Sequence, residues 1–180
     1  MKKTILSIAL ILVSGLIFAQ KKTTTSATIN FDATTSLDQL PKAENKTVIA
    51  SLDIKTGNLA FEVNIKNFAF GNPRMQEHFN SAGWMDSDQF PTAGFKGAIS
   101  NPATIKFNKD GSYAVTVKGD LTIHGVTKPA EATGTIVVKG AAVTATAGFS
   151  IKLEDYAVNG SAIAAGKVSK EPKINVTAEF

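Results

Sequence analysis

The chain has 180 residues, no cysteine and a formal net charge of +4. Without cysteine it can form neither a disulfide nor a cysteine-ligated metal site, and its length fits a single domain. The charges form no basic run or stripe, so the sequence lacks the electrostatic footprint of a nucleic-acid-binding protein and predicts no nucleic-acid partner.

The first 19 residues follow the pattern of a secretory signal peptide. Lys2 and Lys3 give a positive start, the segment Ile5–Phe18 is mostly apolar, and the small residue Ala19 precedes a polar stretch. The apolar run is shorter than the ~20 residues that a membrane-spanning helix needs. We therefore expect a signal peptide at 1–19 rather than an uncleaved anchor, cleavage after Ala19, and no stable membrane span afterwards. The mature protein is expected in the periplasm or outside the cell.

Residues 20–26 are mostly Lys, Thr and Ser, and predict a disordered lead-in. From residue 27 onward, apolar and polar residues alternate along successive segments. Such alternation indicates strands with one buried and one solvated face, which favours antiparallel pairing. The pattern predicts about eight strands, at 27–33, 46–55, 58–67, 93–100, 112–124, 128–139, 141–153 and 172–180.

Turn sequences separate these strands, among them Thr56-Gly57-Asn58, His124-Gly125 and Lys139-Gly140. Long strands joined by short turns fit an up-and-down barrel, which removes exposed sheet edges by closing on itself. We therefore predict an all-β fold, an eight-stranded antiparallel barrel spanning residues 27–180. A two-sheet sandwich stays open as the alternative.

One segment, near residues 73–82, departs from the strand pattern. Asn72 is a suitable helix cap and Pro73 is favoured at the first helical position. Met75 and Phe79 are four residues apart, so a helix would place them on one face. The sequence therefore predicts one short helical insertion in the barrel.

The two histidines, His78 and His124, stand in different contexts. A zinc or iron site usually needs three or four converging ligands, so we assign both histidines to local hydrogen bonds and predict neither a metal site nor a catalytic residue. The chain contains no nucleophile elbow and no phosphate-binding loop. Only a cluster of His78, Glu77 and Asp86 facing the lumen would favour a hydrolase or isomerase that acts on an apolar substrate.

Two blocks of sequence resemble the YceI family. The first contains Phe68-Ala-Phe70, Met75-Gln-Glu-His-Phe-Asn-Ser81 and Gln89-Phe-Pro-Thr-Ala-Gly-Phe-Lys-Gly97, and the second is Gly119-Asp-Leu-Thr-Ile-His-Gly-Val-Thr-Lys-Pro129. The resemblance covers roughly residues 26–180. It implies a lipocalin-like barrel of eight strands whose lumen holds a long isoprenoid or another lipid chain, and export to the periplasm is common in the family.

The aromatic side chains of such a barrel either fill its core or line a tunnel, because eight strands leave room for side chains or for one small ligand. The residues alone leave open an extracytoplasmic structural or interaction domain with a filled core and no ligand. The resemblance implies instead an exported, non-enzymatic protein that sequesters or carries a long-chain apolar ligand, isoprenoid or fatty-acid-like, with no other cofactor. The expected ligand-binding residues of the lumen and cap are Phe61, Phe68, Phe70, Met75, Phe79, Trp84, Met85, Phe90, Phe95 and Phe149.

Overall fold

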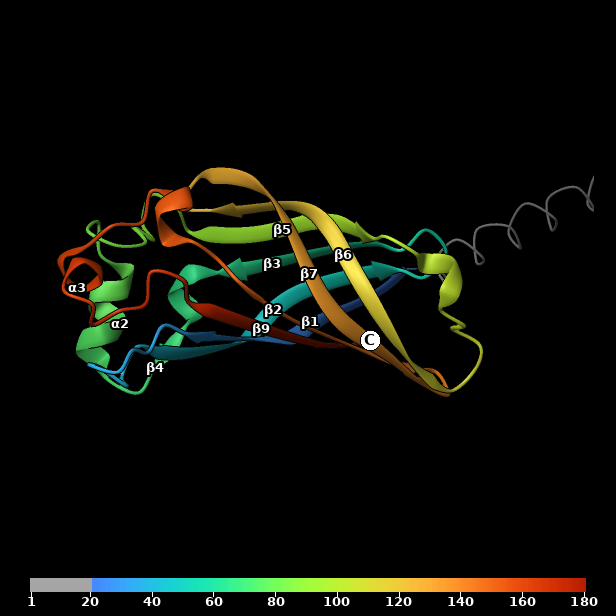
Figure 1. Cartoon of the computed structure of the whole chain (residues 1–180). Coiled ribbons are helices and arrows are strands. Elements are labelled where there is room, and N and C mark those ends of the chain that lie inside the picture. The colour runs from blue at the N-terminus through green and yellow to red at the C-terminus, as the bar shows by residue number, and fades with distance from the viewer. Residues whose placement is uncertain (1–20) are drawn as a thin grey trace, which may run out of the picture.

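The computed structural model describes residues 21–180, whose strands form one antiparallel sheet that closes on itself. Neighbouring strands follow chain order, and the first strand pairs with both the second and the last, which completes the barrel. The predicted eight-stranded lipocalin-like barrel is confirmed (Figure 1). Its long strands are β1 (Lys21–Asp32), β2 (Lys42–Asp53), β3 (Asn58–Asn64), β5 (Thr92–Ile99), β6 (Gly111–Ile123), β7 (Val126–Lys139), β8 (Ala142–Ser150) and β9 (Lys173–Glu179), and the two-residue β4 (Ala69–Phe70) adds to β2.

Most of the helical segments gather at one end of the barrel, which we call the helical end (Figure 1). Within residues 21–180, no helix is both long and apolar enough to cross a bilayer. The helical end carries η1 (Ile65–Asn67), α2 (Pro73–Asn80), η3 (Leu153–Tyr156) and α3 (Ser161–Ala164), whereas η2 (Pro102–Thr104) lies at the opposite end.

The predicted helical insertion is α2. The side-chain oxygen of Asn72 accepts a hydrogen bond from the Arg74 backbone N–H at 2.9 Å, and Pro73 occupies the first turn. The helix ends at Asn80, two residues before the predicted limit, because Ser81 adopts an extended backbone and caps the last turn. Phe79 is buried and Met75 is half-buried, so the apolar face of α2 rests on the barrel.

The turn between β6 and β7 consists of His124 and Gly125, whose φ angles are 50° and 73°. Two positive φ angles in a two-residue turn match the right-handed twist of the flanking strands. The His124 ring packs against Phe90 at a centroid distance of 4.5 Å, and its Nδ1 lies 3.2 Å from the carbonyl oxygen of Tyr156. His124 therefore ties the hairpin tip to η3.

The predicted disordered lead-in is wrong for residues 21–26, which form the first half of β1. They pair with β2, from Lys21 opposite Asp53 to Thr24 opposite Ala50. Pairing of β1 with β9 begins only at Thr28, so the earlier side chains are mostly exposed and show no apolar alternation. The predicted signal peptide at 1–19 and residue 20 lie outside the described residues.

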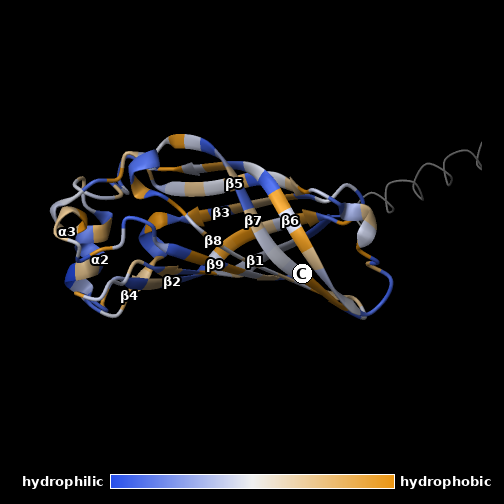
Figure 2. Cartoon of the chain, in the orientation of Figure 1, coloured by the Kyte–Doolittle hydropathy of each residue, from blue (hydrophilic) through white to orange (hydrophobic). Residues whose placement is uncertain are grey.

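Two clusters of buried side chains pack the two ends of the barrel. The larger one, toward the helical end, contains five aromatic rings in mutual contact, at centroid distances from 4.9 to 6.5 Å. The smaller one, at the opposite end, is built around Leu52, Ile99 and Val138. Between them the strands alternate apolar and polar residues, as Figure 2 shows, so the lumen is apolar along its length. The five rings are those of Phe31, Phe68, Phe70, Phe79 and Trp84.

Candidate ligand-binding site

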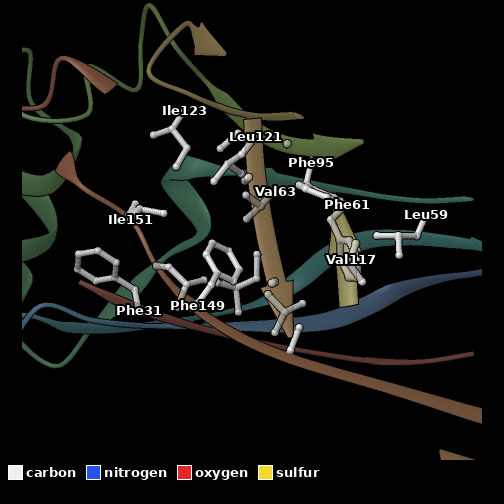
Figure 3. A pocket seen from close by; sticks show the side chains of 18 of the residues that line it. Phe31, Leu59, Phe61, Val63, Phe95, Val117, Leu121, Ile123, Phe149 and Ile151 are labelled. Carbon is white, nitrogen blue, oxygen red and sulfur yellow. The ribbon is translucent and has the colours of Figure 1, made fainter. Parts of the chain in front are cut away.

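Between the two packed ends, the barrel contains a cavity of about 170 Å³. Inward-facing residues of all eight long strands form its wall, and Phe68, Phe79, Trp84 and Met85 border it at the helical end. Figure 3 shows side chains of β1, β3, β5, β6 and β8, among them Phe31, Phe95 and Phe149, around this space. A dry apolar cavity of about 150 Å³ accommodates a molecule such as benzene, so this space suits an apolar group.

Small side chains on two adjacent strands provide much of this space. The inward positions of β7 are occupied by Ala130, Ala132 and Gly134, and those of β8 by Ala145 and Ala147. The four alanines border the cavity directly. In a barrel of eight strands, larger residues at these positions would fill the lumen.

Two glycines on the β5 and β6 side keep a large ring close to the wall. Gly97 and Gly119 stand opposite each other in the ladder. A Cβ atom added at either would lie 2.7 or 2.8 Å from Cζ of Phe95, so the ring lies over both backbones. Because both positions lack side chains, Phe95 lies along the wall and the centre of the lumen stays free.

The inward aromatic rings of the middle region are not fully covered. Phe61, Phe95 and Phe149 all border the cavity and all are only half-buried. A barrel whose interior was filled by side chains would bury such rings completely, as Val138 and Val143, which do not border the cavity, are buried in the smaller cluster. The three rings therefore face open space.

Of the ten residues that the sequence predicts for ligand binding, three do not border the cavity. Phe70 packs behind Phe31 and Phe79, Met75 is half-buried on α2, and Phe90 packs against His124. All three belong to the outer layer of the helical end, because the inner layer is already occupied by other rings. The seven that border the cavity are Phe61, Phe68, Phe79, Trp84, Met85, Phe95 and Phe149.

The residues that could have supported a hydrolase or isomerase are not brought together. His78 and Glu77 are exposed on α2, Asp86 lies in the following loop with a φ of 42°, and none of the three borders the cavity. Across residues 21–180, no three His, Cys, Asp or Glu side chains meet in an arrangement that could hold a metal ion. The wall presents almost only hydrocarbon to the lumen.

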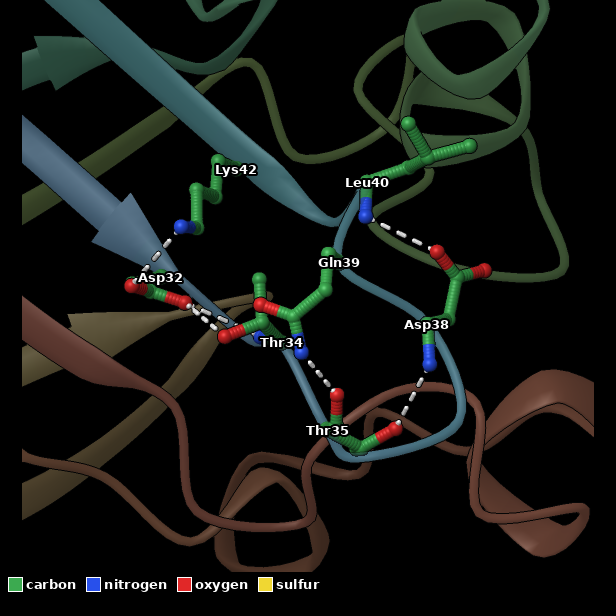
Figure 4. A network of polar contacts seen from close by, with 7 residues as sticks. All are labelled: Asp32, Thr34, Thr35, Asp38, Gln39, Leu40 and Lys42. Carbon is green, nitrogen blue, oxygen red and sulfur yellow. Dashed lines mark hydrogen bonds and ion pairs between the residues drawn. The ribbon is translucent and has the colours of Figure 1, made fainter.

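The polar contacts concentrate outside the lumen, for example in the loop that joins β1 to β2 (Figure 4). Asp32 accepts hydrogen bonds from the backbone N–H and the hydroxyl of Thr34, at 3.0 and 2.7 Å. The hydroxyl contact is the main cause that lowers the pKa of Asp32, and Lys42 adds a weaker attraction. At the helical end, burial raises the pKa of Tyr156, and nearby Asp155 raises it further.

The family model of the YceI-like domain matches residues 16–180. The chain belongs to the YceI-like family. A UPF0312 protein from Pseudomonas fluorescens is 33% identical to this YceI-like chain over 88 residues, which are 48% of the chain and 43% of that relative. The chain thus matches less than half of the length of this curated relative.

Solved structures share the fold of this YceI-like chain at low identity. A polyisoprenoid binding domain from Saccharophagus degradans, described as implicated in plant cell wall breakdown, aligns with a TM-score of 0.74 at 12% identity, covering 89% of this chain and 97% of that one. BcnA from Burkholderia cenocepacia aligns with a TM-score of 0.72 at 19% identity, covering 86% and 96%. The YCEI protein of Campylobacter jejuni aligns with a TM-score of 0.57 at 18% identity, covering 74% and 79%.

Proposed function

We propose that this YceI-like chain is an exported protein that sequesters or carries one long-chain apolar lipid, isoprenoid or fatty-acid-like, in its barrel lumen. The observation that carries the proposal is the apolar cavity, bordered by the half-buried rings of Phe61, Phe95 and Phe149. The shared fold with a polyisoprenoid binding domain makes an isoprenoid the first ligand to test. The signal-peptide pattern at 1–19 supports export.

Hydrocarbon burial can supply the affinity by itself. Each buried methylene contributes about 0.8 kcal/mol, which is offset in part by the entropy cost of association. Among residues 21–180, the one charged side chain that borders the cavity is Glu131, which is exposed to solvent. A polar headgroup is therefore expected to remain outside while the tail occupies the cavity.

Binding fits the wall better than catalysis or a purely structural role. A hydrolase or isomerase needs a positioned acid, base or nucleophile beside its substrate, and His78, Glu77 and Asp86 are all away from the cavity. A structural domain with a filled core would have no such space and would bury Phe61, Phe95 and Phe149.

A substitution that fills the lumen tests the proposal. Replacing Ala147, which borders the cavity, by Trp should occupy the space that a lipid tail needs. Protein purified from its host is extracted with organic solvent, and the extract is analysed by mass spectrometry. We expect a long-chain lipid in the wild-type extract, near one per protein molecule, and its loss from Ala147→Trp.

The matched control is Ala142→Trp, the same change at an exposed position of the same strand. It should retain the lipid. The proposal would fail if wild-type protein yielded no lipid and could not be loaded with geranylgeraniol or a long-chain fatty acid, or if Ala147→Trp carried as much lipid as the control.

A further inference from the structure

The hydrogen-bonded wall of the barrel is interrupted between β7 and β8. Pairs join the two strands from Lys139 opposite Ala142 to Thr133 opposite Gly148, and no further. The first half of β7, residues 126–132, pairs with β6 alone, and the end of β8 pairs with β9 alone. In Figure 1, β7 arches away from the strands below it as it approaches the helical end.

The interruption has a defined beginning and end. At its beginning, a Cβ atom on Gly134 would collide with the carbonyl oxygen of Thr146, so the two backbones lie close together just before the ladder ends. At its end, the His124 ring meets the Tyr156 carbonyl oxygen and joins the tip of β7 to η3. We call the stretch between these points, flanked by residues 130–132 and 148–151, the lateral window.

The cavity also borders two outward-facing side chains of these strands, Glu131 beside the lateral window and Thr146 in the paired ladder. Among residues 21–180, the cavity-bordering residues that are exposed are Glu131 of β7 and Thr146 of β8, and the others are buried or half-buried. Ala130 and Ala132 present only methyl groups on the inner side of the window. Both barrel ends, by contrast, are packed by the two core clusters.

The ladder is also interrupted between β2 and β3, but there a buried polar side chain closes the gap. Pairing of β2 with β3 ends at Ile49 opposite Glu62. There the buried side chain of Asn45 donates to the carbonyl oxygen of Asn64 at 2.9 Å and accepts from the Thr47 N–H at 2.9 Å. The lateral window has no comparable polar plug among the described residues.

We propose that the lipid enters and leaves the lumen sideways through the lateral window, and that its polar end remains there, beside Glu131. This inference rests on the proposed function, because it concerns the route of the same ligand. A lateral route leaves both packed ends intact. It requires that residues 126–132, which are held by a ladder on one side and pack against η3, move relative to β8.

A removable crosslink across the window tests the route. The chain has no cysteine, so Glu131→Cys combined with Ser150→Cys places two thiols on exposed positions of the two strands. A short bismaleimide with a central disulfide joins them and can later be cut by a reductant. Entry and release of cis-parinaric acid are followed in stopped flow by energy transfer from Trp84, the single tryptophan, which borders the cavity.

We expect the crosslink to slow both entry and release by about tenfold or more, and reduction to restore both rates. The control pair, Val137→Cys with Thr144→Cys, lies opposite in the intact ladder of the same strands and should load at the wild-type rate when linked. The window variant carrying a monofunctional maleimide controls for loss of the Lys118–Glu131 ion pair.

A second variant should raise the release rate that the crosslink lowers. His124→Asn removes the ring that closes the end of the window, while asparagine tolerates the positive φ of this turn. It should release parinaric acid severalfold faster than wild type. Equal rates in linked and cut protein, together with an unchanged rate in His124→Asn, would overturn the lateral route and leave the proposed function standing. Failure of every variant, and of wild type, to bind any long-chain probe would overturn both.

Discussion

Individual small side chains decide how much space this barrel holds. Eight strands would allow either a filled or a hollow interior. Here Ala130, Ala132 and Ala147 border the cavity, and the facing Gly97 and Gly119 keep the Phe95 ring against the wall. The lumen is hollow because alanine and glycine occupy inward positions where a strand usually carries larger apolar residues.

The paired glycines yield a test at this scale. Gly97→Ala would place a methyl group against the Lys118 carbonyl oxygen and 2.7 Å from the Phe95 ring. The backbone of β6 would have to shift to relieve the contact. We expect a loss of about 1–3 kcal/mol in the free energy of unfolding, measured by urea denaturation.

The matched control is Gly71→Ala, because an added Cβ there meets no atom within 4 Å. Its stability should stay within about 0.5 kcal/mol of wild type. Equal effects of the two substitutions would contradict the view that the glycine pair is required for the close approach of Phe95.

At the level of residues, the sequence predicts the site only in part. The predicted set consists mostly of large aromatic side chains, and seven of its ten residues border the cavity. Phe70, Met75 and Phe90 do not, because composition cannot separate an inner from an outer layer of the same end. The alternating small residues Ala130, Ala132 and Gly134 were the missed signal, since they mark where the lumen is open.

At the level of elements, the β1–β2 loop shows how a short connection is held by its own polar side chains. Asp32 accepts from Thr34, the Thr35 hydroxyl accepts from the backbone N–H groups of Leu37 and Asp38, and Asp38 accepts from Leu40 (Figure 4). Because the loop satisfies its backbone groups locally, it can leave Leu37 and Leu40 exposed without unfolding.

The lowered pKa of Asp32 predicts a pH effect on stability. The ionised carboxylate is favoured in the folded chain, so its contribution is fully present above the unfolded value of about 3.9 and is lost as pH falls through the lower folded value. Asp32→Asn should therefore be less stable than wild type near neutral pH, and the difference should shrink with acidification. Urea unfolding at several pH values measures it.

Asp120→Asn, at an exposed position of β6 that makes no side-chain hydrogen bond within the described residues, is the control. It should track wild type across the same pH range. A stability difference for Asp32→Asn that stayed constant from neutral pH to below 3 would contradict the assignment to this carboxylate.

The elements that the sequence predicts well are those with one dry and one wet face. All eight long strands and α2 were predicted, with ends displaced by a few residues. The start of β1 was not, because the side chains of residues 21–26 are mostly exposed and polar on both faces. Threonine favours strands, so the run Thr23-Thr24-Thr25 held a signal that the overall polarity of the segment obscured.

For the whole molecule, the closure of the barrel couples distant parts of the chain. β1 pairs with β9, so residues near position 30 and near position 175 complete one wall. The first strand begins at Lys21, two residues after the expected cleavage point, so removal of residues 1–19 would leave every described element intact. The fold is therefore compatible with the expected export signal.

Export can be tested directly. The full chain, expressed in a Gram-negative host with a tag after Phe180, should be recovered from the periplasmic fraction with Gln20 as its first residue, as read by mass spectrometry of the intact protein. The short apolar run gives the reason, because it suits a cleaved signal better than an anchor. A variant lacking residues 2–19 should stay in the cytoplasm. Full-length protein retained in the membrane fraction would contradict the prediction.

The first half of β7, which has no β8 partner on its other side, has a consequence for solubility. A free strand edge offers backbone N–H and C=O groups to any other strand, and so promotes aggregation. Here the exposed residues Lys128, Pro129 and Glu131 supply two charges and one position without a backbone N–H. These are the features with which natural sheets discourage pairing between molecules, so the same strand can stay open to a small apolar guest while remaining a poor template for a second copy of the chain.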